Sequence, residues 1–113
     1  LLIAFTGKKS GREYITPVQY AREGSAVWIV VGWPKNKHWW RNLVGGAPVR
    51  LCLQRQWQAG NAMVFEGESG RQGVIEGLRA MAAKYPNMKS TQYGQDAPSF
   101  DAAGHVVIKV TPV

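Results

Sequence analysis

Hydrophobic and polar residues alternate along several short stretches of this chain, and each stretch is bounded by glycine, proline or polar turn residues. Alternation with a period of two places every second side chain on the same face, which is the pattern of a β-strand packed against a core. Glycine, serine and asparagine, which separate these stretches, are favoured in tight turns. The pattern predicts six strands, at residues 1–6, 12–22, 26–31, 48–53, 57–66 and 106–110.

Two residues modify this strand pattern. Pro17 lacks the amide hydrogen that a central strand needs, so we place its part of the second strand at a sheet edge or a bulge. Gly60 interrupts the fifth strand and predicts a kink or a bulge there.

Two other segments have the periodicity of helices. Residues 37–44 follow Asn36, whose side chain can cap the start of a helix, and precede Gly45, which favours a helix end. Residues 69–84 carry apolar side chains at intervals of three and four, with Ser69 as a candidate cap. We therefore expect one short helix and one longer helix whose apolar face packs on the sheet.

The order of these elements predicts the fold class. Short turns between consecutive strands favour antiparallel pairing, and closing the strands into a barrel removes exposed sheet edges. We predict a mainly β (α+β) fold, a small six-stranded antiparallel barrel that forms one domain over residues 1–113. Because the chain opens in an apolar run without an initiator methionine, we expect further residues before Leu1.

The composition is that of a globular domain. Apolar residues make up 45% of the chain and charged residues 19%, which is too hydrophobic for a disordered tail. No apolar run reaches the roughly 20 residues that a transmembrane helix needs. The single cysteine, Cys52, forms no intrachain disulfide, which favours a cytoplasmic location, and its strand pattern predicts a small buried hydrophobe rather than a catalytic thiol.

The net charge of +7 lies entirely in the first half of the chain. Residues 1–55 hold nine lysines and arginines against two acids, whereas residues 56–113 hold five of each. A one-sided positive field attracts phosphates, carboxylates, nucleic acid or an acidic membrane surface, although a basic face can also serve solubility alone. The charge therefore favours an anionic ligand without choosing its class.

The first candidate site is the glycine-rich bend at residues 6–12. Two glycines, one of them Gly11, free the backbone to turn successive N–H groups into one concavity, which suits an anion. The bend also carries three cations and one hydroxyl donor, namely Lys8, Lys9, Arg12 and Ser10. The spacing is not that of a P-loop, and a basic turn in solvent has the same composition, so that simpler interpretation stays open.

The second candidate is the tryptophan-rich segment at residues 32–43, which holds three of the five tryptophans among three cations and a histidine. In the predicted helix Trp39 shares a face with Leu43 and neighbours Asn42. One tryptophan can seat this helix on the barrel, whereas a second one, beside positive charge, suits a planar or amphipathic ligand. Asn42 could orient a ligand carbonyl or cap a strand.

Motifs for other chemistry are missing from the sequence. His38 and His105 have no acidic partner at ligand spacing, so we predict no metal site and interpret both as surface residues. No G-x-S-x-G elbow or other motif of a nucleophilic triad is present, which argues against a hydrolase. Any redox or transfer chemistry would then be carried by a bound cofactor.

Four motifs occur together in an order that resembles one family. They are T-G-K-K-S-G at residues 6–11, Thr16-Pro17 followed by Tyr20, W-W-R-N-L at residues 39–43, and Tyr85-Pro86. They span nearly the whole chain and resemble the deazaflavin-dependent nitroreductases, which have a split β-barrel, flavin-reductase-like fold. The resemblance implies that the predicted barrel is a six-stranded antiparallel split β-barrel with one short and one longer helix.

The resemblance also implies a cofactor, coenzyme F-420, a deazaflavin with a phosphate and an anionic polyglutamate tail; FMN is the less favoured alternative. The phosphate end would be held by Lys8, Lys9, Ser10 and Gly11, with the charge of Arg12 beside them. The tricyclic ring would be lined by Thr16, Pro17, Trp39 and Asn42. Lys35 or Lys37 would replace a lysine of the family's loop before the tryptophan motif.

The implied reaction is hydride transfer to a hydrophobic conjugated acceptor, such as a quinone, an enone or a nitro compound. Tyr85 would close over this acceptor and supply a proton.

The chain departs from the family in a shorter loop that carries Trp33, which could instead occupy the space of the ring. The alternative function is therefore non-catalytic binding of a lipid or fatty acid near a membrane. Nucleic-acid binding ranks last, because the tryptophans do not line a strand face. A homodimer is a further expectation, since split-barrel sites are often shared between subunits.

Overall fold

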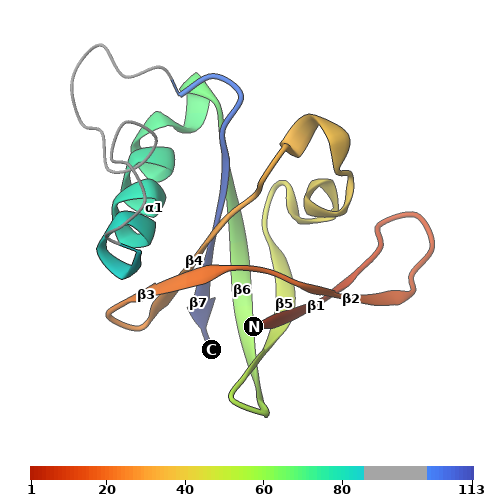
Figure 1. The fold of residues 1–113 in the computed structure, drawn as a ribbon. Helices are drawn as coiled ribbons and strands as arrows, with labels where there is room; N and C mark the ends of the chain where they lie inside the picture. The colour runs from red at the N-terminus through yellow and green to blue at the C-terminus, as the bar shows by residue number, and fades with distance from the viewer. Residues whose placement is uncertain (86–101) are drawn as a thin grey trace.

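A computed structural model of the protein describes residues 1–85 and 102–113. In this part of the chain one antiparallel sheet contains β1 (Leu2–Thr6), β2 (Glu13–Pro17), β3 (Tyr20–Glu23), β4 (Ala26–Val30), β5 (Ala47–Leu53), β6 (Gln56–Glu66) and β7 (Val106–Pro112). The helical elements are the 3-10 turns η1 (Pro34–Asn36), η2 (Trp39–Leu43) and η3 (Glu68–Gly70) and the helix α1 (Arg71–Lys84). Across the sheet the strands follow the order β2-β1-β5-β6-β7-β4-β3. Figure 1 shows the sheet curled into a half-barrel, with α1 on the left and η1 and η2 at the upper right.

The predicted second strand, residues 12–22, is two strands in the structure. β2 pairs with β1, where Ile3 lies opposite Thr16, whereas β3 pairs with β4. These are the two opposite edges of the sheet, so the chain at residues 18–19 crosses from one edge to the other (Figure 1). Pro17 lies in an edge strand, as predicted. The mainly antiparallel barrel fold is thereby confirmed, with seven strands in the described residues instead of six.

The inner face of the half-barrel holds the main hydrophobic core. Alternate strand residues point into it, as their spacing in the sequence predicted. The core consists of Ile3, Phe5, Val27, Ile29, Val31, Trp40, Leu43, Val49, Leu51, Ala62, Val106, Ile108 and Val110. Two of these residues, Trp40 and Leu43, come from η2, which therefore packs directly on the core.

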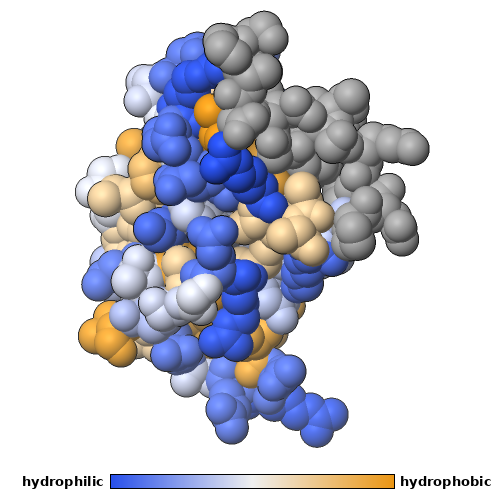
Figure 2. Space-filling model, turned by 90° about the vertical axis from the view of Figure 1, so that its left-hand side faces the viewer, coloured by the Kyte–Doolittle hydropathy of each residue, from blue (hydrophilic) through white to orange (hydrophobic). Residues whose placement is uncertain are grey.

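The predicted longer helix covers the outer face over β3, β4, β6 and β7. Two helix glycines allow a close approach to the sheet: a Cβ on Gly73 would lie 2.1 Å from Cγ of Phe65, and one on Gly77 would lie 2.3 Å from Cγ1 of Val107. Beneath the helix Trp28 is almost fully buried. On the solvent side this face carries many strongly hydrophilic side chains (Figure 2). No helix in residues 1–85 or 102–113 is long and apolar enough to cross a membrane.

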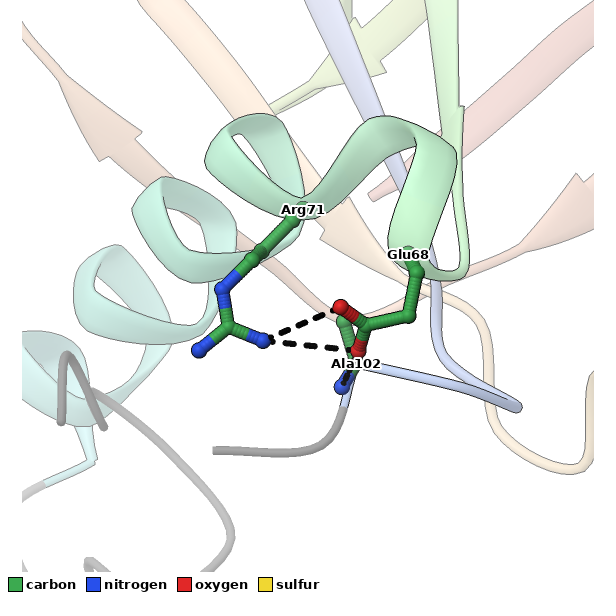
Figure 3. A network of polar contacts seen from close by, with 3 residues as sticks. All are labelled: Glu68, Arg71 and Ala102. Atoms are coloured by element: carbon green, nitrogen blue, oxygen red, sulfur yellow. Dashed lines mark hydrogen bonds and ion pairs between the residues drawn. The ribbon is translucent and has the colours of Figure 1, made fainter. Parts of the chain in front are cut away.

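The start of α1 differs from the prediction. Ser69 does not cap the helix, because its hydroxyl donates to the carbonyl of Glu66 at 2.9 Å within the turn that precedes α1. The carboxylate of Glu68 instead accepts a hydrogen bond from Arg71 at 3.2 Å and another from the backbone amide of Ala102 at 2.5 Å (Figure 3). This carboxylate ties the beginning of the helix to the chain that leads into β7.

The predicted short helix at residues 37–44 is replaced by the two 3-10 turns. Asn36 does not act as a cap; it lies inside η1, and no side-chain hydrogen bond caps either turn. Residues three apart eclipse in a 3-10 helix. The buried pair is therefore Trp40 with Leu43, rather than Trp39 with Leu43. So short a segment gains little from α-helical hydrogen bonds, and burial of the Trp40 indole decides its geometry.

Two smaller expectations are corrected by the sheet register. Gly60 pairs without interruption with Val49 on one side and Pro112 on the other, so it forms no bulge. A Cβ at this position would lie 2.7 Å from Cγ1 of Val110, so close strand packing explains the glycine. Cys52 is half-buried and does not belong to the core, because the buried residues that β5 gives to the core are Val49 and Leu51, which alternate with the face of Cys52.

Candidate functional site

The glycine-rich bend at residues 6–12 and the turn η2 meet on the side of the half-barrel away from α1 (Figure 1). The backbone amide of Lys8 donates to Oδ1 of Asn42 at 2.9 Å, and its Nζ donates to the carbonyl of Val44 at 2.8 Å. Asn42 also donates from Nδ2 to the carbonyl of Trp39 at 2.9 Å, which fixes the amide between the two segments. The two candidate segments of the sequence therefore form one site.

A cavity of about 460 Å³, the first cavity, lies between these segments. It is lined by Phe5, Gly7, Lys8, Lys9, Ser10, Tyr14, His38, Trp39, Arg41 and Asn42. The ring of Phe5 lies 5.8 Å from that of Tyr14 and 5.6 Å from that of Trp39, so the aromatic groups form one wall. An aromatic wall beside several cations suits a planar ligand that carries an anionic group.

Hydrogen bonds inside the bend already use three of its backbone amides, and a fourth, that of Lys8, is used by Asn42. The amide of Gly7 donates to the carbonyl of Arg12 at 2.8 Å, and the amide of Gly11 donates to the carbonyl of Gly7 at 2.9 Å. The amide of Arg12 donates to Oγ of Ser10, which also lies 3.1 Å from the hydroxyl of Tyr14. Gly11, with φ of 70°, serves the turn itself, and neither Gly11 nor Arg12 lines the first cavity. The bend therefore offers side chains to a ligand rather than a row of free amides.

The three cations of the first cavity differ in their availability. Lys8 is held by the carbonyl of Val44, and the guanidinium of Arg41 stacks over the ring of Trp40 with 5.4 Å to the centroid. Lys9 is exposed and makes no hydrogen bond or ion pair with any residue that the structure describes. Its ammonium group is therefore the cation most available to an anionic ligand.

A second cavity of about 580 Å³ shares Trp39 with the first. It is lined by Thr16, Pro17, Val18, Gln19, Val30, Val31, Gly32, Trp33, Lys37 and Trp39. Thr16 and Pro17, which the resemblance places beside a cofactor ring, thus line the same cavity as Trp39. The two cavities together bring most of the predicted binding residues around one tryptophan.

Trp33 stands at the rim of the second cavity rather than inside it. Its side chain is 75% exposed, and its backbone has the left-handed φ of 48°. A side chain so exposed does not fill the space of a cofactor ring, which was the alternative that the shorter loop suggested. Lys37 lines the same cavity and is also exposed, so it is the loop lysine that reaches the site.

Two other predicted site residues lie outside both cavity linings. Lys35 lines a third cavity, together with Glu66 and Glu68. Tyr85 follows the last residue of α1 and packs, half-buried, against the cluster that contains Trp28. The structure therefore gives neither residue a contact with the first or second cavity.

Sequence reasoning missed several residues of the first cavity. Phe5 and Tyr14 lie directly opposite each other in the β1–β2 register, and Arg41 comes from η2. A hairpin closed around the bend would have placed Phe5 beside Tyr14, and this signal was present in the sequence. His38 is exposed, as predicted, but it also lines the cavity.

A curled antiparallel half-barrel with an aromatic, positively charged cleft defines a class of protein suited to an anionic flavin-type cofactor. A model of the F420H(2)-dependent quinone reductase family matches residues 1–97, and the chain belongs to this family. The match confirms the resemblance found in the four motifs and makes coenzyme F-420 the cofactor. Among curated proteins, none matches the chain.

The residues of the site fit this cofactor. F-420 combines a planar ring with phosphate and carboxylate groups, and the cavities combine the ring of Trp39 with the ammonium of Lys9 and the hydroxyl of Ser10. Neither described lining contains an aspartate or a glutamate that would repel the anionic groups. In the described residues no group of three or more histidine, cysteine, aspartate or glutamate side chains could hold a metal ion.

Replacing Asn42 by alanine is expected to loosen the junction between the bend and η2. The change removes two hydrogen bonds at 2.9 Å, one from the amide of Lys8 and one to the carbonyl of Trp39. We expect a loss of about 1–2 kcal/mol in the free energy of unfolding and a several-fold weaker affinity for F-420. Denaturant unfolding and F-420 titration measure these effects. Asn61→Ala, at an exposed position of β6, is the matched control, and equal F-420 affinities of the two variants would contradict the prediction.

Proposed function

We propose that this protein transfers a hydride from reduced F-420 to a hydrophobic conjugated acceptor, with a quinone as the preferred acceptor and enones or nitro compounds as further ones. The observation that carries this proposal is the pair of cavities that share Trp39. One cavity has cations for an anionic cofactor, and the other has an apolar wall for a hydrophobic acceptor. Membership of the F420H(2)-dependent quinone reductase family supports the choice of quinone.

In this proposal the first cavity holds the phosphate end of the cofactor at Lys9 and Ser10. A charge-assisted hydrogen bond from an ammonium to a phosphate oxygen is about twice as strong as a neutral one. Lys8 acts by position, because its amide and its ammonium tie the bend to η2 and so keep the cavity walls together. Trp39 offers its indole to the ring at the boundary of the two cavities, near Thr16 and Pro17.

Bound reduced F-420 supplies the hydride, and the acceptor also takes up one proton when a quinone becomes a hydroquinone. The protein contributes mainly orientation, because two neighbouring cavities hold donor and acceptor in contact and remove the entropic cost of their encounter. The apolar part of the second cavity, formed by Val18, Val30 and Val31, limits water around the acceptor. Tyr85 lies outside the described linings of both cavities, so the proton comes from solvent at the rim instead.

The direct test combines a binding measurement with a turnover measurement. Titration of the protein into oxidised F-420 should change the deazaflavin fluorescence with a dissociation constant on the order of micromolar. Addition of a quinone to reduced F-420 and protein should restore the absorbance of the oxidised cofactor. FMN serves as the matched cofactor control and should bind more weakly. Unchanged deazaflavin fluorescence at saturating protein would overturn the proposal.

The second candidate function is non-catalytic binding of a lipid or a fatty acid. The apolar wall of the second cavity and the exposed indole of Trp33 at its rim favour it. Native mass spectrometry of the purified protein separates the two functions. A bound fatty acid in a protein that leaves F-420 fluorescence unchanged would support the lipid-binding function, whereas displacement of a bound lipid by F-420 would support the reductase.

A further inference from the structure

The most exposed tryptophan of the described chain, Trp33, directly precedes the turn η1, and two lysines follow it within four residues. Trp33 is 75% exposed, and Lys35 and Lys37 are exposed as well. The amide of Asn36 donates to the carbonyl of Trp33 at 3.0 Å, and the amide of Lys37 donates to the carbonyl of Pro34 at 3.3 Å. These two hydrogen bonds make the turn tight, so that the indole and both ammonium groups project from one short loop.

Packing within the chain does not explain a tryptophan at position 33. The left-handed backbone, with φ of 48° and ψ of 59°, suits glycine or asparagine and costs other residues on the order of 1 kcal/mol. The exposed indole recovers little of that cost by burial. Tryptophan, like tyrosine, is enriched at the boundary between lipid headgroups and acyl chains, because its ring is apolar and its N–H is polar.

The charge around this turn favours an anionic partner. Residues 24–65 contain no aspartate or glutamate. Lys37 lines the second cavity, whose described lining is free of acids, so its charge is not offset there. Lys35 shares the third cavity with Glu66 and Glu68, which offset part of its charge. Lys37 should therefore attract an anionic surface more strongly than Lys35 does.

We propose that η1 docks the protein on an anionic lipid bilayer, with Trp33 inserted at the level of the headgroups and Lys37 and Lys35 against the lipid phosphates. Because Trp33 and Lys37 also line the second cavity, docking sets the rim of that cavity against the membrane, where hydrophobic acceptors dissolve. The docking itself does not depend on the acceptor; its use for delivering a quinone rests on the proposed function.

The test measures binding of the full chain, without cofactor, to vesicles by co-sedimentation. Vesicles of phosphatidylcholine mixed with phosphatidylglycerol should bind the protein, vesicles of phosphatidylcholine alone should bind it far less, and added salt should release it. Trp33→Asn, which suits the left-handed backbone, should weaken binding about tenfold. Lys37→Gln should weaken it about fivefold, which corresponds to about 1 kcal/mol for one lysine at a membrane surface, and Lys35→Gln should have a smaller effect.

The matched controls lie at the opposite end of the molecule. Arg55→Asn and Trp57→Gln remove one charge and one exposed indole near the β5–β6 turn, which is at the bottom of Figure 1, whereas η1 is at the top. Both control variants should bind the anionic vesicles within about twofold of the unmodified protein. Tryptophan emission should shift to the blue on these vesicles in the unmodified protein and in Arg55→Asn, and the shift should be absent in Trp33→Asn.

Three results would overturn the proposal. In the first, the unmodified protein does not bind the anionic vesicles. In the second, the control variants weaken binding as much as Trp33→Asn does, and in the third, Trp33→Asn abolishes a self-association of the protein but leaves vesicle binding unchanged. The vesicle assay and the F-420 titration test the two proposals separately. If the protein binds vesicles but leaves the deazaflavin fluorescence unchanged, only the proposed function is wrong. If the fluorescence changes but the protein does not bind vesicles, only the docking surface is wrong.

Discussion

Replacing Lys9 by glutamate is expected to weaken the affinity for F-420 by about 30- to 100-fold, which corresponds to roughly 2–3 kcal/mol. Lys9 lines the first cavity and has no hydrogen bond or ion pair with another described residue, so its charge is free for the ligand. The substitution removes an attraction for the phosphate and adds a repulsion. Titration by deazaflavin fluorescence measures the effect, which should shrink as salt is added.

The control for Lys9→Glu must change the net charge equally at a distant position. Arg55→Glu does this in the β5–β6 turn, outside the linings of the first and second cavities. We expect Arg55→Glu to retain F-420 affinity within about twofold at moderate salt, because exposed charges beyond a Debye length are screened. If both substitutions weaken F-420 binding equally, overall charge rather than Lys9 governs the affinity.

Replacing Gly73 by alanine should lower the free energy of unfolding by about 2 kcal/mol. Alanine favours a helix over glycine by about 1 kcal/mol, so propensity alone would stabilise α1. The new methyl group, however, would lie 2.1 Å from Cγ of Phe65, and forcing extra volume into a packed contact costs roughly 1–3 kcal/mol, at its upper end for so short a distance. The clash should exceed the gain in propensity, and denaturant unfolding measures the difference.

Gln72→Ala provides the comparison for this experiment. Gln72 is the exposed neighbour of Gly73 on α1, so alanine there should be neutral or slightly stabilising. A Gly73→Ala protein as stable as Gln72→Ala would mean that the ring of Phe65 rotates away at no cost, and would contradict the close packing of α1 on β6.

Alternation located the strands correctly, because inward residues such as Ile3, Val49 and Ile108 are apolar while their neighbours along the strand meet solvent or the helix. It did not show that residues 12–22 change partners. The period of two continues through the crossing at residues 18–19, and only pairing with β1 on one side and β4 on the other separates the two strands. Local pattern carries no information about partners that lie elsewhere in the chain.

The part of the candidate site that is formed by residues adjacent in the sequence could be predicted. Lys8, Lys9 and Ser10 follow one another in the bend, and the structure places them in one cavity with Trp39 and Asn42. The predicted helix at residues 37–44 placed Trp39 on the face of Leu43, whereas in the structure Trp40 is buried with Leu43 and Trp39 lines both cavities, on the side that the family resemblance implied. Helical spacing of three or four residues could not distinguish these cases, since the period depends on whether the turn is α or 3-10.

The position of β7 in the sheet has a consequence for the co-translational folding of this protein. β7 follows the other described strands in the chain, yet it lies between β6 and β4 and is the neighbour that connects them. Until β7 emerges, the described strands can pair only as two groups, the four strands β2-β1-β5-β6 and the hairpin β3-β4, because no other described strand joins β6 to β4. Vectorial synthesis thus leaves the barrel open until its last described strand arrives, and this interval is when the chain is most exposed to aggregation and most in need of chaperones.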